Sequence, residues 1–184
     1  PKSLWDAPPF EPHRDGDWLY GRGAGDMKAG LAANLFALDA LRSLGFQPAA
    51  PVYLQSVTEE ECTGNGALSA LVRGYQADAA IITEPVGESL VRANVGVIWF
   101  RVHVRGYPVH VASASSGANA IDAAAYLMQA LKTFEAERNA KKSEFPRFAE
   151  IEKPINVNVG KIEGGDWASS VPSWCSFDVR TGIY

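Results

Sequence analysis

Carboxylates that could bind a metal ion or transfer protons occur at three places in the first half of the sequence. Asp26 follows a loop of alternating glycines, residues 21–25, and precedes a helical pattern. Three consecutive glutamates, residues 59–61, follow one short apolar run, and Glu84 follows another. Divalent cations bind such oxygen ligands, and a carboxylate can also act as a general base. These positions are therefore the first candidates for chemistry.

Each acidic position also has a simpler interpretation. Asp is among the commonest residues at a helix N-terminus, so Asp26 could simply cap a helix. The glutamates at 59–61 could form a solvated loop, because their mutual repulsion is relieved by water, by protonation or by a cation. A dinucleotide loop is a third interpretation of residues 21–25. However, the spacing differs from G-x-G-x-x-G, and Asp26 would repel a phosphate.

The segments around these acids alternate between helical and extended patterns. The predicted elements are a helix over residues 26–44, strands over 52–57 and 79–82, and a short helix over 67–72. Such alternation predicts an α/β domain with a mainly parallel sheet. Ligands of these sheets bind beyond the carboxyl ends of the strands, where residues 59–61 and Glu84 lie. This placement favours a divalent metal site over an isolated cap or loop.

The pattern changes near residue 94. Alternation over residues 98–104 predicts a half-buried strand whose wet face carries Trp99, Arg101 and His103. The other predicted elements are a helix over 119–137, a loop over 138–150, and strands over 155–159 and 175–179. Strand, helix, strand and strand begin a ferredoxin-like α+β unit. In such a unit the Cys175 thiol is expected to pack in the core.

Composition excludes several classes of protein. The chain has 184 residues, 47% of them hydrophobic and 21% charged, which is typical of a soluble globular protein. The net charge is −4 and the longest run of basic residues is the pair 141–142, so neither nucleic acid nor a membrane surface is expected as a partner. Two cysteines are too few for a disulfide framework, and a cytoplasmic location is expected.

Three motifs in order resemble the M20 metallopeptidases, a family that includes acetylornithine deacetylase and succinyl-diaminopimelate desuccinylase. The first is Gly21-Arg22-Gly23-Ala24-Gly25-Asp26-Met27-Lys28, which is similar to the metal-bridging motif. The second is Glu59-Glu60-Glu61, with Glu59 in place of the usual Asp. The third is Glu84-Pro85. The resemblance extends over essentially the whole chain.

The resemblance implies a role for each acidic residue. Asp26 would bridge two zinc ions, for which cobalt or manganese are possible substitutes. Glu61 would bind one zinc ion and Glu84 the other. Glu60 would be the general base, which takes a proton from the attacking water and passes it to the leaving amine. Two zinc ions would also polarise the amide carbonyl of the substrate.

The resemblance also implies roles in the second half. His110, in a Gly-x-x-x-His motif that begins at Gly106, would reach a neighbouring subunit's active site and stabilise the oxyanion. Asn119 would lie near the substrate, and Arg180 would bind the substrate's carboxylate with its guanidinium fork. Without the resemblance, His110 and Arg180 would be an ordinary loop histidine and a solvated strand residue. Many family members carry an Asn where this chain has Ser169, so one polar substrate contact differs.

The implied fold is an α/β catalytic domain of the zinc-exopeptidase type with an inserted ferredoxin-like α+β lid or dimerisation domain. Residues 1–93 would form part of the catalytic domain and residues 94–184 part of the lid. The family's His-x-Asp motif would precede Pro1, and its last His ligand would follow Tyr184. Because zinc needs about four ligands, often nitrogen or sulfur, the chain as given is expected to be a catalytically inactive central fragment.

Three functions follow as alternatives. The first is a dizinc hydrolase that cleaves N-acyl amino acids or small peptides and forms a homodimer through its lid. The second is a non-catalytic dimerisation or assembly module, which the missing histidines favour. The third is a metal-dependent aminopeptidase, which would share the metal site but would not need Arg180 to bind a carboxylate.

Overall fold

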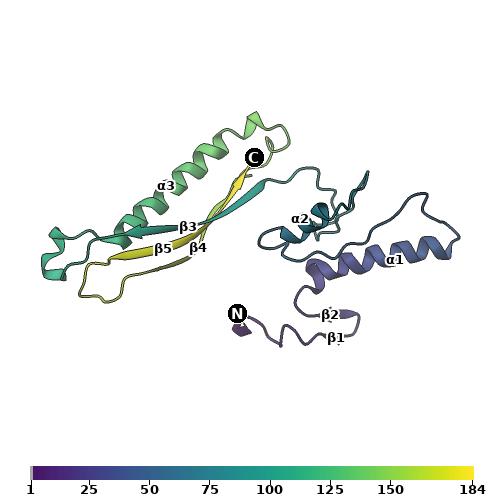
Figure 1. The fold of residues 1–184 in the computed structure, drawn as a ribbon, viewed down its shortest axis with the longest axis horizontal. Helices are drawn as coiled ribbons and strands as arrows, with labels where there is room; N and C mark the ends of the chain where they lie inside the picture. Colours follow the sequence, from purple (N-terminus) through teal and green to yellow (C-terminus); the bar gives the residue numbers. More distant parts are fainter. Residues whose placement is uncertain (1) are drawn as a thin grey trace. The chain divides into compact units, whose positions relative to one another are not determined.

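A computed structural model describes residues 2–184 of the chain. The chain divides into two compact units, Pro1–Leu90 and Val91–Tyr184 (Figure 1). The sequence predicts a division between residues 93 and 94, and the catalytic and lid roles of the two parts stay predictions. No helix in the described part of the chain has the length and apolarity needed to span a membrane.

The first unit consists of two short strands and two helices. They are β1 (His13–Asp15), β2 (Trp18–Tyr20), α1 (Ala29–Ser43) and α2 (Asn65–Val72), with a 3₁₀ turn at Lys2–Leu4. Strands β1 and β2 form an antiparallel pair, in which the rings of His13 and Tyr20 stack 5.1 Å apart. His13 is exposed and stacks on its cross-strand neighbour, as is common in antiparallel pairs.

Helix α1 begins three residues later than the sequence predicts. Residues Ala24–Lys28 form an irregular turn because Asp26 and Met27 have non-helical backbone angles. The predicted end is confirmed: Gly45 has a φ of 82°, a left-handed conformation that glycine adopts at low cost. Its N–H donates to the Arg42 carbonyl at 3.0 Å and so closes the helix.

The two strands predicted in this unit do not form. Residues 52–57 and 79–82 are irregular, and their apolar side chains are exposed, with Ile81 at 83% and Val52 at 55% exposure. The predicted parallel sheet is not confirmed, since both sheets found among residues 2–184 are antiparallel. An extended segment becomes a strand only when a neighbour satisfies its backbone hydrogen bonds, and no described residue does so for either segment.

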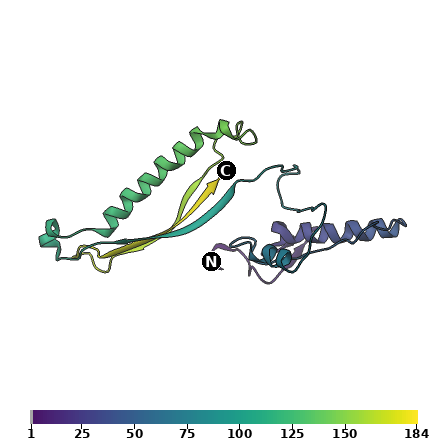
Figure 2. The ribbon, with the colours of Figure 1, turned by 45° about the horizontal axis from the view of Figure 1, so that its top comes forward.

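The second unit has the predicted order of strand, helix, strand and strand. The elements are β3 (Gly96–Arg105), α3 (Ala120–Ala140), β4 (Val157–Gly164) and β5 (Trp174–Ile183), with 3₁₀ turns at Val111–Ser116 and Lys142–Glu144. The strands form an antiparallel sheet in the order β3-β5-β4, and α3 lies along one face of it (Figure 2). This is the topology of the first four elements of a ferredoxin-like unit.

The core of the second unit lies between α3 and the sheet. Phe177 and Val179 of β5 are 1% and 2% exposed, and they pack with Ala120 and Ala124 of α3. Small residues on the helix let the backbone approach the sheet, so the larger β5 side chains fill the space between them. The expected burial of Cys175 is confirmed, and this burial raises the pKa of its thiol.

The opposite face of the sheet is polar and open, as the alternation in β3 predicts. Trp99 lies opposite Arg180 in the neighbouring strand, and Arg101 lies opposite Asp178. The Arg101 guanidinium donates two hydrogen bonds to the Asp178 carboxylate, at 2.5 and 2.8 Å. This pair lowers the pKa of Asp178 and fixes the register of β3 against β5.

Side chains of α3 form hydrogen bonds with the backbone groups at the edge of the sheet where β4 begins. Asn139 accepts from the Ile155 N–H at 3.0 Å and donates to the Ile155 carbonyl at 2.7 Å. Glu135 accepts from the Val157 N–H at 2.6 Å, and Lys132 donates to the Val157 carbonyl at 3.2 Å. These side chains take the place of a neighbouring strand over two residues and join the helix to the sheet edge.

We expect the second unit to lose stability in acid through Glu135, which is 6% exposed. Burial alone would raise the pKa of this carboxyl, but the Val157 N–H and the charges of Lys153 and Lys132 hold it below its usual range. A depressed pKa stabilises the fold at neutral pH, and this contribution is lost as the pH falls from about 4.5 through the lower folded value. Urea midpoints measured from pH 7 to pH 3 will show this loss.

The matched variants for this prediction are Glu135→Gln and Glu137→Gln. We expect the first to lower the free energy of unfolding at pH 7 by about 1–3 kcal/mol and to flatten its dependence on pH. Glu137 is exposed, so its variant should follow the wild-type curve. An unchanged curve for Glu135→Gln would contradict the assignment.

Candidate functional site

The first unit brings two of the predicted site residues into contact. The carboxyl groups of Asp26 and Glu84 lie close enough to interact, although 57 residues of chain lie between them. Glu84 is half-buried, and burial is the largest cause that raises its pKa. The charges of Glu60, Asp26 and Glu61 raise the pKa of Glu84 further. The acids predicted from three separate motifs therefore act on one another here.

The three consecutive glutamates begin a tight turn. The carbonyl of Glu59 accepts from the N–H groups of Thr63 and Gly64 at 3.1 and 2.9 Å. Its carboxylate accepts from the Thr63 hydroxyl at 2.5 Å, and its φ is 62°, which is uncommon for a residue with a Cβ. Glu59 thus holds the turn together, while Glu60 and Glu61 supply the charges felt by Glu84.

The negative charge of the acidic residues suits a divalent cation, but these residues do not provide a complete set of metal ligands. Carboxylate oxygens are ligands for zinc and for harder cations, and mutual repulsion between the acids would be relieved by a cation. Among the described residues, however, no group of three His, Cys, Asp or Glu side chains is arranged to hold a metal ion. A zinc site needs about four ligands, so the fit is incomplete.

His110 lies at the start of the 3₁₀ turn Val111–Ser116 in the second unit. Its Nδ1 accepts a hydrogen bond from the Ala112 N–H at 3.2 Å. Because Nδ1 is the acceptor, the neutral imidazole carries its proton on Nε2. The side chain is exposed, so this Nε2–H is available as a donor. The backbone is held by the neighbouring contact from the Val111 N–H to the Ser169 carbonyl, at 3.0 Å.

Asn119 caps helix α3. Its Oδ1 accepts from the N–H groups of Ile121 and Asp122 at 2.9 and 3.2 Å. The residue also lines a hollow of about 520 Å³ together with Val111 and Trp167. The carboxamide oxygen is therefore used by the helix, and only the carboxamide N–H₂ can serve a ligand in the hollow.

Substitutions at Asn119 should separate its two roles. Asn119→Ala removes the cap and is expected to lower the free energy of unfolding by about 1 kcal/mol. Asn119→Asp keeps an oxygen for the cap but removes the N–H₂ donor, so it should retain the stability of the wild type. Urea unfolding of both variants checks this prediction, and equal loss in the two variants would contradict it.

Arg180 lies on the open face of the sheet in β5. Its guanidinium carbon is 6.0 Å from the centre of the Trp99 ring, a cation–π distance. Among residues 2–184, Arg101 has a carboxylate partner and Arg180 has none within ion-pair distance. The guanidinium of Arg180 is exposed and is free to bind an anion.

The predicted site residues thus form two groups. Asp26, Glu60, Glu61 and Glu84 belong to the first unit, and His110, Asn119 and Arg180 belong to the second. The structure brings the first group together around Glu84. It describes the second group as separate positions on the 3₁₀ turn, the N-terminus of α3, and β5.

Sequence reasoning missed Trp99 and Thr63. Trp99 was predicted only as a residue of the wet face, although its register opposite Arg180 places the ring beside the guanidinium. The sequence pattern does not indicate the role of Thr63, which donates a hydrogen bond to the Glu59 carboxylate. The alternation of β3 could have indicated the contact between Trp99 and Arg180. The contact between Thr63 and Glu59 depends on the left-handed backbone conformation of Glu59.

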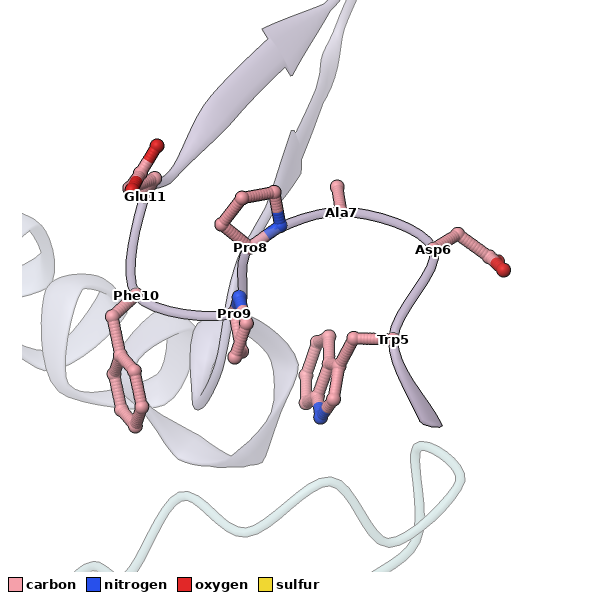
Figure 3. A pocket seen from close by; sticks show the side chains of 7 residues that line it. All are labelled: Trp5, Asp6, Ala7, Pro8, Pro9, Phe10 and Glu11. Carbon is pink, nitrogen blue, oxygen red and sulfur yellow. The ribbon is translucent and has the colours of Figure 1, made fainter. Parts of the chain in front are cut away.

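The arm that leads into β1 forms a second hollow, of about 430 Å³ (Figure 3). Its wall consists of the consecutive residues Trp5, Asp6, Ala7, Pro8, Pro9, Phe10 and Glu11. The guanidinium of Arg22 lies 5.4 Å from the Trp5 ring and helps to hold the bend. None of the predicted site residues lines this hollow.

The sequence is similar to several enzymes. It is 32% identical over 190 residues to N-formyl-4-amino-5-aminomethyl-2-methylpyrimidine deformylase of Bacillus subtilis, covering 98% of this chain and 44% of that protein. It is 32% identical over 181 residues to acetylornithine deacetylase of Erwinia tasmaniensis, covering 96% and 45%. A probable succinyl-diaminopimelate desuccinylase of Staphylococcus aureus is 31% identical over 177 residues, covering 94% and 43%. The chain spans less than half the length of these relatives.

A solved structure has a similar fold. It is a tripeptidase from Staphylococcus aureus, with a TM-score of 0.62 and 20% sequence identity, covering 94% of this chain and 44% of that one. Residues 1–166 match the family described as "Peptidase family M20/M25/M40". Because that match covers most of the chain and relatives at 32% identity cover nearly all of it, the chain belongs to peptidase family M20/M25/M40.

Proposed function

We propose that the protein is a hydrolase that cleaves an amide bond in an N-acylated small molecule. The observation that carries the proposal is the contact between Asp26 and Glu84 with the charge of Glu60 beside it, in a chain of the M20 family. The named relatives remove formyl, acetyl or succinyl groups, each of which is joined to nitrogen by an amide.

Glu60 is the general base of the proposed reaction. It takes a proton from the attacking water and returns it to the nitrogen of the leaving amine. The Nε2–H of His110 is a donor for the oxyanion that forms on the carbonyl oxygen, because its Nδ1 accepts from Ala112. Since a neighbouring subunit would supply this histidine, the proposal includes a homodimer formed through residues 94–184.

Asp26, Glu61 and Glu84 are the residues that would hold the metal, for which two zinc ions are the proposed cofactor. When bound, zinc would lower the pKa of water and polarise the carbonyl of the substrate. Histidine ligands would have to complete the coordination, because the described residues do not supply a full set. Glu60 and His110 are residues of this chain, so their proposed roles do not depend on the geometry of the metal site.

The role of Arg180 decides between two classes of substrate. An exposed guanidinium at cation–π distance from Trp99 fits the carboxylate of an N-acyl amino acid or small peptide. The name of the deformylase substrate, however, contains no acid group, and that relative matches 98% of this chain. An N-formylated amine without a carboxylate is therefore the second candidate substrate.

Arg180→Ala tests this assignment. If the substrate carries a carboxylate, we expect KM for an N-acetyl amino acid to rise about 10- to 100-fold, because a charge-assisted hydrogen bond contributes about 1.5–3 kcal/mol. Hydrolysis of an N-formylated amine without a carboxylate should not change. Steady-state kinetics with both substrates are the measurement, and Arg105→Ala on the same strand face as Trp99 is the control.

The alternatives predict other results. An aminopeptidase would hydrolyse unacylated peptides, and its KM would not depend on Arg180. A dimerisation module would form a dimer and hydrolyse none of these substrates. Equal KM values for wild type and Arg180→Ala with an N-acetyl amino acid would contradict the proposed carboxylate substrate.

A further inference from the structure

Gly30 of helix α1 lies directly against Thr83, the residue that precedes Glu84. A methyl group built on Gly30 would lie 2.5 Å from the Thr83 hydroxyl oxygen and closer still to the Thr83 carbonyl oxygen. Such distances are shorter than any ordinary contact, so only a residue without a side chain allows this approach. A glycine inside a helix costs about 1 kcal/mol relative to alanine, so the helix itself gives no reason for it.

A second contact joins the same face of α1 to Thr83. The side-chain N–H of Asn34 donates to the Thr83 hydroxyl at 3.2 Å. Positions 30 and 34 are one helical turn apart, so both lie on one face of α1. Thr83 is thus held by a close backbone approach and by a hydrogen bond.

Gly66 of helix α2 makes the same kind of contact near the other acidic motif. A methyl group built on Gly66 would lie 2.6 Å from the Thr58 nitrogen and closer still to the Thr58 carbonyl oxygen. Thr58 directly precedes the three glutamates, as Thr83 directly precedes Glu84. Each acidic motif therefore follows a threonine that lies directly against a helix glycine.

We propose that Gly30, Gly66 and Asn34 are positioning residues. Gly30 and Asn34 set how closely helix α1 approaches the segment before Glu84, and Gly66 sets how closely helix α2 approaches the segment before Glu59. Helix α1 begins three residues after Asp26 and contacts Thr83, which directly precedes Glu84, so it links the segments that carry both acids. This inference rests on the proposed function, in which these acids form the active site.

The geometry gives the size of the expected effect. To bring a methyl group on residue 30 into ordinary contact, Thr83 must move by about 1 Å. Glu84 is the next residue and would move with it, which would weaken its contact with Asp26. A displacement of about 1 Å in a catalytic arrangement can lower the rate about 100-fold.

The experiment compares Gly30→Ala, Gly66→Ala and Asn34→Ala with a matched control in the full-length protein. Gly160→Ala adds the same methyl group where nothing lies closer than 3.4 Å, so it controls for the substitution itself. For each protein we would measure the urea midpoint, retention of Zn²⁺ after dialysis, and kcat and KM for an N-acetyl amino acid and an N-formylated amine. Backbone amide chemical shifts of Asp26 and Glu84 would be recorded as well.

The inference predicts that Gly30→Ala and Gly66→Ala lower kcat by about 10- to 100-fold, change KM little, and retain less Zn²⁺ than Gly160→Ala. Asn34→Ala, which adds no clash, should lower kcat several-fold at an unchanged urea midpoint. A folded Gly30→Ala with wild-type kcat would overturn the inference. If a glycine variant does not fold, an unchanged kcat in Asn34→Ala would overturn it.

Failure of the proposed function would look different. A wild-type protein that retains no Zn²⁺ and hydrolyses neither substrate would contradict the proposed function. In that protein the amide shifts still decide the inference. The inference requires the amide chemical shifts of Asp26 and Glu84 to change in Gly30→Ala and to stay unchanged in Gly160→Ala. Unchanged shifts in Gly30→Ala would overturn the inference.

Discussion

Glu60→Gln is expected to lower kcat of the full-length protein by about 10²- to 10⁴-fold, because glutamine cannot accept the proton that a general base removes from water. KM should change little, since Glu60 acts on the water and not on the bound substrate. The side chain is exposed and lies outside every helix and strand, so the fold should tolerate the exchange. Steady-state kinetics with an N-acetyl amino acid and an N-formylated amine provide the measurement.

A matched control separates loss of charge from loss of the base. Glu150→Gln removes one negative charge from an exposed loop of the second unit and should leave kcat unchanged. Zn²⁺ retained by the Glu60 variant should equal that of the wild type, since Asp26, Glu61 and Glu84 are the proposed ligands. Full activity of Glu60→Gln would show that another group takes the proton.

Phe177→Ala is expected to destabilise the second unit by about 3–5 kcal/mol, because it removes a ring that is 1% exposed at the centre of the core. The ring projects from β5 and packs with the small residues Ala120 and Ala124 of α3, which cannot extend to fill the space that is left. The cost therefore includes both the lost burial and the cavity. Urea unfolding followed by tryptophan fluorescence measures the change in the free energy of unfolding.

The control for this prediction is Phe36→Ala. Phe36 lies on α1 and is 70% exposed, so its removal should change the free energy of unfolding by no more than about 0.5 kcal/mol. Equal effects of the two substitutions would show that Phe177 is not at the centre of a packed core.

The second unit could be predicted well because its pattern is local and two-sided. Alternation in residues 98–104 and 175–179 identifies one face for the core and one for solvent, and the amphipathic pattern of residues 119–137 identifies the helix between them. The sequence predicts the Cys175 burial for the same reason. Helix α3 nevertheless extends to Ala140, beyond the predicted 137, because helix ends depend on local hydrogen bonds that the pattern does not specify.

The first unit was predicted less well because its strands depend on distant partners. The apolar residues of 52–57 and 79–82 have the composition of buried strands, yet both segments are exposed and unpaired in the described chain. Local composition indicates that a segment can be extended, but a sheet needs hydrogen bonds from elsewhere in the sequence. Helices α1 and α2 form because their hydrogen bonds are internal.

The sequence names the residues of the candidate site but does not indicate the contacts between them. Motif order predicts that Asp26 and Glu84 belong to one site, and in the structure the two acids lie close enough to interact. The close approach of Gly30 to Thr83 could not be predicted, because a glycine in a helix pattern does not say what lies beside it. The cation–π contact of Arg180 with Trp99 likewise depends on the register of two strands.

The central claim is tested most directly by the metal content and amide hydrolysis of the full-length protein, before and after removal of metal by a chelator. We predict about two Zn²⁺ per chain and hydrolysis of an N-acetyl amino acid or an N-formylated amine, as two-metal hydrolases require. The activity should be lost with the metal and return when Zn²⁺ is added. A protein that binds no metal, or whose hydrolysis persists in its absence, would contradict the proposed function.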